Sequence, residues 1–528
     1  MQSGKTLKWI ESDRFWVLLL ALLGCLTRIP FASKILYHWD SINYSLALKE
    51  FNISLHQPQP PGYILYVYLT RLVNVFLPEP QTTFLFLNFL FSTLAAIALY
   101  FLGKVMFDRR VGVLGGLFLL FSPLFWFYSE IALPNVIDAF IVTLIAYFFF
   151  KTSQGDQKAV WIAAILLGIS GGFRQQTLIF MAPLAVYAVR KLKFSQMLLS
   201  GACATAIFLL SFIPMVMLNG GLEGYRASVS ALSNSAFVQT SVFTGGGLSA
   251  LKRNLAKLAG FTIYAVFLSA VPLVAWPAAF IKKVPGFLRS HKAWFLAIWA
   301  LPSLFFYSFI HMGGHGLIFT YLPALIVVAA AALVNLVDSF AHSAELRRKW
   351  ILGLGIVIVI ADIVIFTLAP NKIPLGNSSL LIVNWQTVQK NDRFYASRFS
   401  AIQKQFDPAG TIVMASKWRH AQYYLFNFQV YSALCASNGD DGFAGEIYAL
   451  RDKRYQVYPG GDITAALGSP PTALVFFDRD STCILDENTR ARLQEIPMDP
   501  ADDSLFVLPL SGNEQFDYQL GQLTIRSK

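Results

Sequence analysis

Residues 82–106, TTFLFLNFLFSTLAAIALYFLGKVM, form an apolar run long enough to cross a bilayer as a helix. A charged turn, Asp108-Arg109-Arg110, separates this run from a second apolar run at residues 111–128. The same alternation continues through the first 370 residues and predicts about eleven transmembrane helices. The predicted spans are residues 15–36, 82–106, 111–128, 134–150, 159–173, 175–190, 196–218, 255–281, 293–310, 316–338 and 350–369.

The amino-acid composition also indicates a mainly α, polytopic membrane protein. Of the 528 residues, 55% are hydrophobic and only 14% are charged, too few for the surface of a water-soluble protein of this size. The net charge of +12 is confined to the membrane part, because residues 1–370 carry +14 and residues 371–528 carry −2. Since the basic residues lie in short connections between apolar runs, they follow the positive-inside rule and predict no nucleic-acid partner.

The basic connections also predict the orientation of the chain in a plasma or inner membrane. They all fall on one side if the N-terminus is cytoplasmic. Residues 62–78, GYILYVYLTRLVNVFLP, would reverse the later connections if they crossed the membrane, so we expect an interfacial helix there. The first apolar run has no clear cleavage site, which favours an uncleaved anchor. An odd number of spans then places the C-terminal part outside the cytoplasm.

The composition changes after Pro370, and residues 371–528 are long enough for a small extracytoplasmic α/β domain with its own core. Short apolar runs at residues 411–414 and 473–477 are typical of buried strands, and residues 385–406 are expected to form a helix. Cys435 and Cys483 lie in this part, and they could pair if it faces an oxidising compartment.

Two stretches of the first predicted outer loop carry the most information about function. The first is His38-Trp39-Asp40-Ser41-Ile42-Asn43-Tyr44, just after the first span, and the second is His56-Gln57-Pro58-Gln59-Pro60-Pro61-Gly62-Tyr63. An aspartate outside the first membrane helix, followed by a Pro-Pro turn into an interfacial helix, resembles the GT-C glycosyltransferases that use polyprenyl-phosphate sugars. Within them, residues 10–370 resemble most the branch of protein O-mannosyltransferases and ArnT-like lipid A aminoarabinose transferases.

The resemblance implies that Asp40 is the general base for an acceptor hydroxyl. A direct sugar transfer needs such a carboxylate, and this one lies where a lipid donor presents its headgroup. The alternative is a solvated acid at a helix end. Some relatives carry a second acid directly after the aspartate, and here Ser41 takes that place.

Two further carboxylates, Glu130 and Asp138, flank Pro134 at the predicted outer ends of consecutive spans. Carboxylates near lipid usually face a polar cavity. The resemblance implies a role near the donor phosphate, the acceptor or a bound cation, with Glu130 as a second catalytic candidate and Asp138 as a binding residue. The alternative is that Asp138 caps its helix and Glu130 is hydrated.

Arg174 lies at a predicted outer turn, against the positive-inside trend, and therefore requires an anionic partner. A lipid-linked phosphate is the expected partner, since a guanidinium binds phosphate oxygens in a fork. The alternative is an arginine that snorkels to lipid headgroups.

His311 and His315 have the i, i+4 spacing of a helical zinc pair, but Gly313 and Gly314 between them argue against a helix. We expect both histidines to line the pocket and to contact phosphate or sugar. The resemblance adds Tyr321, which stands before Pro323 at the entry to the next helix, and His56 of the first outer loop is a further binding candidate.

These observations predict a membrane glycosyltransferase that moves a sugar from a polyprenyl-phosphate donor to a lipid, glycan or protein acceptor at the outer face. The sequence contains no Walker A motif and no GxGxxG after a strand, so the energy is expected to come from the donor. No resident cofactor is expected, and a divalent cation is left open. The alternative functions are a lipid or glycolipid flippase, which the chargeless middle helices disfavour, and a non-catalytic scaffold.

Overall fold

The computed structural model describes residues 12–238, 240–375, 378–433, 446–451, 454–459, 462–498, 504–518 and 521–528. The chain divides into two compact units. The first unit contains the residues up to Ser33 and Tyr44–Thr387, and the second contains Lys34–Asn43 and Val388–Lys528. This division differs from the single boundary predicted at residue 370, because a segment of the first outer loop packs with the C-terminal residues.

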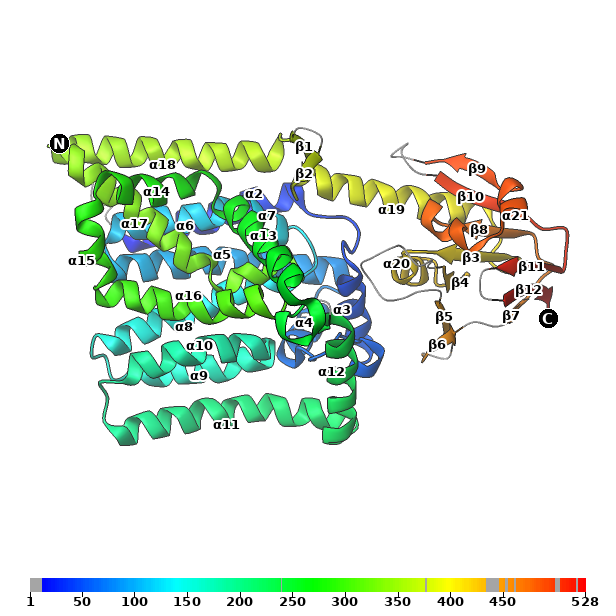
Figure 1. The fold of residues 1–528 in the computed structure, drawn as a ribbon, viewed down its shortest axis with the longest axis horizontal. Helices are drawn as coiled ribbons and strands as arrows, with labels where there is room; N and C mark the ends of the chain where they lie inside the picture. Colours follow the sequence, from blue (N-terminus) through cyan, green and yellow to red (C-terminus); the bar gives the residue numbers. More distant parts are fainter. Residues whose placement is uncertain are drawn as a thin grey trace. The chain divides into compact units, whose positions relative to one another are not determined.

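The first unit is a bundle of α-helices (Figure 1). Its α-helices are α2 (Asp13–Arg28), α4 (Ile64–Asn74), α5 (Pro80–Met106), α6 (Arg109–Phe121), α7 (Pro123–Ser129), α8 (Asn135–Ser153), α9 (Ala159–Phe173), α10 (Gln175–Val189), α11 (Phe194–Leu218), α12 (Gly221–Phe237), α13 (Gly247–Val266), α14 (Ala270–Ala279), α15 (Val284–Leu288), α16 (His291–Phe309), α17 (Leu322–Phe340) and α18 (Ala344–Thr367). Helix α3 (Trp39–Lys49) begins in the second unit and ends in the first. Short helical turns are η1 (Ile29–Phe31), η2 (Ile53–Leu55), η3 (Val242–Gly246), η4 (Phe267–Ser269), η5 (Ile281–Lys283) and η6 (His315–Thr320), and a hairpin of β1 (Lys372–Leu375) and β2 (Ser378–Leu381) follows α18.

The described residues contain eight helical segments long and apolar enough to cross a membrane, and a ninth if α6 and α7 count as one bent span. Helices α9 and α10 are apolar but shorter, and they bring the total to the predicted eleven if each of them crosses. The mainly α, polytopic architecture is confirmed, whereas the number of spans stays a prediction. Helices α5, α8 and α17 are mostly buried, and α2 and α11 expose most of their apolar surface, as expected next to lipid.

Two of the predicted segments show how local sequence shapes the bundle. The run at residues 111–128 is broken by 59° between α6 and α7, because Pro123 has no N–H to continue the ladder of α6. Helix α4 has 11 residues and is about 17 Å long, too short to cross the hydrocarbon core of about 30 Å. This length agrees with the predicted interfacial helix.

Close packing of α9 against α11 and α4 depends on glycines that follow one face of α9. A Cβ atom at Gly168 would lie 2.5 Å from the carbonyl oxygen of Ala204 in α11. A Cβ atom at Gly172 would lie 2.5 Å from Cδ1 of Leu65 in α4. The absence of a Cβ atom at these two positions therefore allows this approach, as in other tightly packed membrane helices. Figure 1 shows α8, α9, α10 and α11 side by side.

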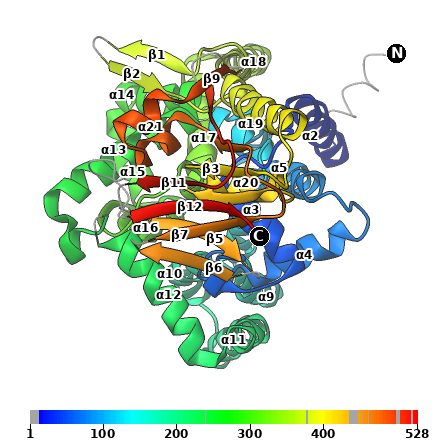
Figure 2. The same cartoon turned by 90° about the vertical axis from the view of Figure 1, so that its right-hand side faces the viewer.

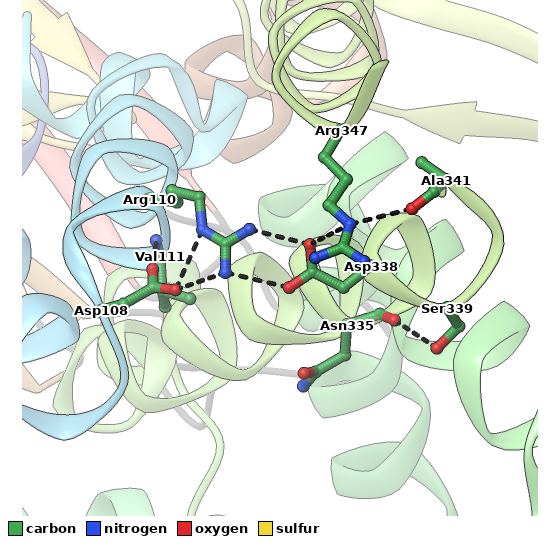
Figure 3. Close-up of polar contacts among 8 residues, drawn as sticks. All are labelled: Asp108, Arg110, Val111, Asn335, Asp338, Ser339, Ala341 and Arg347. Carbon is green, nitrogen blue, oxygen red and sulfur yellow. Dashed lines mark hydrogen bonds and ion pairs between the residues drawn. The ribbon is translucent and has the colours of Figure 1, made fainter. Parts of the chain in front are cut away.

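Ion pairs join the helix ends that carry two of the predicted cytoplasmic clusters (Figure 3). Arg110 at the start of α6 binds Asp338 of α17 through both terminal nitrogens, at 2.8 and 2.9 Å, and also binds Asp108. Nε of Arg347 in α18 donates to the carbonyl of Ala341 at 2.8 Å. These basic residues thus hold helix ends together in addition to the topological role that the sequence predicts for them.

The second unit is built around a mixed seven-stranded sheet of order β6-β5-β4-β3-β8-β10-β9. Strands β4, β3 and β8 are parallel, and the other pairs are antiparallel. A second sheet has the order β11-β12-β7, and these strands lie side by side in Figure 2. The strands are β3 (Thr411–Ala415), β4 (Gln429–Ser432), β5 (Glu446–Arg451), β6 (Arg454–Pro459), β7 (Ile463–Leu467), β8 (Ala473–Phe476), β9 (Gln494–Pro497), β10 (Ser504–Pro509), β11 (Glu514–Tyr518) and β12 (Gly521–Ser527), and the helical elements are α19 (Trp385–Gln405), α20 (Trp418–Tyr424), η7 (Arg479–Ile484) and α21 (Glu487–Ala491).

Alternating side chains of β3 and β8 build two cores, one on each face of the seven-stranded sheet. Val413 and Val475 pack with α19 and α20, whereas Ile412 and Leu474 pack with strands β7, β11 and β12. Both faces are therefore covered, which explains the continuous apolar runs in the sequence. The predicted α/β domain, its helix and its two buried strands are confirmed. Cys483 is disulfide-bonded, and Cys435 lies outside the described residues.

The close approach at Gly172 gives a first test of the bundle. Gly172→Ala should lower the unfolding free energy by about 1–3 kcal/mol, because the new methyl group overlaps Leu65 and the hydroxyl of Ser211. Thermal unfolding in detergent measures the effect. Gly201→Ala in α11 is the matched control, since a Cβ atom there meets nothing within 4 Å. Equal melting temperatures for the two variants would contradict the packing of α9 against α4.

Candidate active site

Arg174 and Asp138 form a buried ion pair at one end of the membrane unit. Arg174 has an extended backbone between α9 and α10, and Asp138 lies in the first turn of α8. The two side chains are only 9% and 7% exposed, and Nη1 of Arg174 donates to Oδ2 of Asp138. Thr177 Oγ1 donates to the other carboxylate oxygen at 3.3 Å. The anionic partner that the sequence requires for Arg174 is therefore, in the first instance, Asp138.

The pair leaves part of the guanidinium available. Nε of Arg174 is buried and has no hydrogen-bond partner among the described residues. Tyr63 and Tyr307 lie close enough to Arg174 to interact with it electrostatically. A buried donor without a partner is costly in a dry bundle, and an anionic ligand would satisfy it.

A second cation, Lys257 of α13, lies near His311 together with Arg174. Burial and these two charges lower the pKa of His311 to about 4, so the imidazole is neutral at neutral pH. Nδ1 of His311 lies 2.9 Å from Oγ1 of Thr240. Lys257 is not among the residues that the sequence predicts for a site, although it lies at the predicted outer end of the span at residues 255–281, against the positive-inside trend.

The Pro-Pro turn of the first predicted outer loop approaches this cluster. Gln175 Nε2, next to Arg174, donates to the carbonyl of Pro61 at 3.4 Å, and Tyr225 Oη donates to the same oxygen at 3.3 Å. Gly62 has φ 122°, a backbone conformation that favours glycine, and a Cβ atom there would lie 2.6 Å from Sδ of Met215. His56 lies farther back in the loop, where it ends the turn η2 with a left-handed backbone at φ 56°.

His315 and Tyr321 both contact α13, so the loop before α17 packs along this helix. The imidazole of His315 lies 4.3 Å from the ring of Phe261, and Tyr321 Oη lies 2.6 Å from Oγ1 of Thr262. Residues 311–314 are not helical, so the two histidines do not have the geometry of a helical zinc pair. The described residues contain no group of three or more metal-ligating side chains.

Glu130 is buried beside Arg28, in a place separate from the Arg174 pair. Neither carboxylate oxygen has a hydrogen-bond partner within the described part of the chain. Burial raises the pKa of Glu130, and the positive charge of Arg28 opposes this shift. Arg28 lies over the ring of Trp126 at 5.1 Å and donates to the carbonyl of Leu120. Arg28 is not among the residues that the sequence predicts for a site.

Asp40 lies in the second unit, in the first turn of α3, with 27% of its side chain exposed. His38 caps this helix, because its Nδ1 accepts from the Asp40 N–H at 3.1 Å. Ser41 completes the cap, since its hydroxyl accepts from the His38 N–H at 3.2 Å. Ser41 thus has a structural role at the position where some relatives carry an acid.

Comparisons with known proteins identify solved structures that have a similar fold. ArnT from Cupriavidus metallidurans in the apo state matches with a TM-score of 0.56 and 12% identity, over 94% of this chain and 97% of that one. The chain has the GT-C fold in its ArnT-like form. ArnT from Cupriavidus metallidurans bound to undecaprenyl phosphate matches with a TM-score of 0.52 and 11% identity, over 94% of this chain and 98% of that one.

Two further matches cover a smaller part of this chain. A family model described as dolichyl-phosphate-mannose-protein mannosyltransferase matches residues 58–218 of the ArnT-like chain. The Archaeoglobus fulgidus oligosaccharyltransferase in the apo form matches with a TM-score of 0.47 and 13% identity, over 79% of this chain. The chain spans 64% of that protein's length. A sequence comparison with curated proteins gives no match.

The buried pair predicts a distinctive stability pattern. Arg174→Leu or Asp138→Leu alone should lower the unfolding free energy by about 3–5 kcal/mol, because each leaves an unpaired buried charge. The double variant Asp138→Leu/Arg174→Met should recover most of this loss. Melting temperatures in detergent measure the pattern. Glu345→Gln, which removes the exposed pair with Lys349, is the control and should leave the melting temperature unchanged. Single variants as stable as wild type would show that the pair is not buried.

Proposed function

We propose that this chain is an integral-membrane glycosyltransferase that moves a sugar from a polyprenyl-phosphate donor to an acceptor hydroxyl at the outer membrane face. The observation that carries the proposal is the buried Arg174 guanidinium, which is held by Asp138, retains an unpartnered Nε and lies near Tyr63. Lys257 is a second cation near His311. The ArnT-like fold supports it, and ArnT has been solved with undecaprenyl phosphate bound.

The donor phosphate is the ligand that this cluster suits best. Asp138 neutralises the charge of Arg174 and orients its guanidinium, whose Nε–H is still available to a phosphate oxygen, and Lys257 adds a second cation near the neutral imidazole of His311. In the proposed reaction these cations hold the phosphate and stabilise the negative charge that develops as the sugar leaves. His315, Tyr321 and His56 are proposed as further contacts to donor or acceptor.

The acceptor proton is proposed to move to Asp40. The acceptor oxygen attacks the anomeric carbon, its proton passes to an oxygen of the Asp40 carboxylate, and the bond from that carbon to the phosphate oxygen breaks. The lipid phosphate leaves with the electron pair. The proposed reaction needs no resident cofactor, because the donor carries its own leaving group. Glu130 is the alternative base, but it is buried against Arg28, whereas Asp40 is partly exposed.

Transfer of radiolabelled sugar from a panel of polyprenyl-phosphate sugars tests this proposal. Asp40→Asn should lower kcat by about 10²–10⁴-fold, because the amide cannot take the acceptor proton. Arg174→Ala should abolish transfer together with donor binding. Glu487→Gln is the matched control, since it removes another acid from a first helical turn of the second unit and should transfer at the wild-type rate.

The outcomes separate the alternatives. Transfer that survives in Asp40→Asn but is lost in Glu130→Gln would assign the base to Glu130. If the wild type transfers no sugar from any donor, while proteoliposomes move a fluorescent glycolipid across the bilayer, the glycosyltransferase is excluded and the chain is a flippase.

A further inference from the structure

The segment of residues 34–37 leads from the first membrane helix to Asp40, and side chains of the second unit bind its backbone. Asp392 of α19 accepts the N–H of Lys34 at 2.9 Å and the N–H of Ile35 at 3.1 Å, one with each carboxylate oxygen. Hydrogen bonds to a carboxylate are stronger than those between neutral groups. Asp392 is itself buried, so the bonds are shielded from water.

Two residues of α20 bind the backbone N–H and the carbonyl of the next residue, Leu36. The N–H of Leu36 donates to Tyr424 Oη at 2.9 Å, and the carbonyl of Leu36 lies 2.8 Å from Nε2 of His420. A carbonyl can only accept, so Nε2 carries the proton. Burial lowers the pKa of His420 to about 3, so the ring is neutral and Nδ1 is free to accept from Tyr395 Oη at 3.3 Å.

Four successive backbone groups of one loop are thus bound by three side chains that follow it in the sequence by more than 350 residues. The side chain of Leu36 is also buried, and Arg419 of α20 lies over the ring of Trp39 at 5.6 Å. Asp40 lies one helical turn after Leu36 in the sequence, and the helix cap formed by His38 and Ser41 fixes the start of its helix. The direction of the Asp40 carboxylate therefore depends on where the segment is held.

We propose that Asp392, His420 and Tyr424 are positioning residues that hold the 34–37 segment and thereby set the place of the Asp40 carboxylate. This proposal rests on the proposed function, in which Asp40 takes the acceptor proton. It assigns to the second unit a part in catalysis that acts through the position of Asp40. A base displaced by about 1 Å can lose about 10²-fold in rate, so such a clamp has a measurable effect.

The test combines turnover with hydrogen exchange in the full-length protein. Asp392→Asn should lower kcat by about 10–100-fold with the donor KM changed less than twofold, because an amide can accept only one of the two N–H groups. The amides of residues 34–36 should exchange at least about tenfold faster, while those of β3 keep wild-type protection. Asp407→Asn is the matched control, since Asp407 also accepts a backbone N–H, from Ala409 at 3.2 Å, away from the loop.

A second variant pair separates positioning from folding. His420→Gln retains an N–H donor for the Leu36 carbonyl and should keep most of the activity, whereas His420→Leu should behave as Asp392→Asn does. Slow exchange in β3 in both variants shows that the unit is folded.

The proposal is overturned if the amides of residues 34–36 exchange faster in Asp392→Asn while kcat stays at the wild-type value. It is equally overturned if their exchange does not change. Failure of the proposed function gives a different result: the wild type transfers no sugar, or Asp40→Asn transfers at the full rate, whatever the exchange of the loop.

Discussion

A charge inside a lipid-embedded bundle is stable only when an opposite charge or a hydrogen-bond partner is buried with it. The candidate site follows from this constraint. Arg174 is held by Asp138 and Thr177, and Glu130 is accompanied by Arg28. In each place the partner satisfies only part of the group, because Nε of Arg174 and both carboxylate oxygens of Glu130 lack hydrogen-bond partners among the described residues. Such incomplete satisfaction is unfavourable for stability and useful for binding a ligand.

The packing of small residues brings these charges to one end of the bundle. Glycines on α9 allow α4 and α11 to approach, and the turn at Pro61 then lies beside Gln175. Side chains in place of these glycines would separate the first outer loop from the start of α10. The position of Arg174 therefore depends on residues that carry no charge and no functional group.

The second unit adds a different kind of order. Alternating residues of β3 and β8 form two cores, and one of them packs α19 and α20 against the sheet. Asp392 on α19 and His420 on α20 then present hydrogen-bonding groups in fixed positions to the 34–37 segment. A segment that lies in an outer loop by sequence is thus a part of the C-terminal unit by its contacts.

The sequence by itself determined the architecture, because hydropathy and the alternation of apolar residues are local properties of the chain. It predicted a polytopic helical unit, a helix at residues 385–406 and buried strands at residues 411–414 and 473–477. It also selected Asp40, Asp138 and Arg174 as site candidates, since charged residues at membrane edges are rare enough to be noticed individually.

Only the tertiary structure decided which of these residues meet. The sequence analysis treated Arg174 and Asp138 as separate candidates, and it gave no role to Arg28, Lys257, Asp392 or His420. The division of the chain into two units also differs from the single boundary predicted at residue 370, because residues more than 350 positions away bind the 34–37 segment. Each of these pairings joins helices or loops through contacts at long sequence separation. Periodicity and composition do not predict such contacts, because the contacts form only when packing brings the helices together.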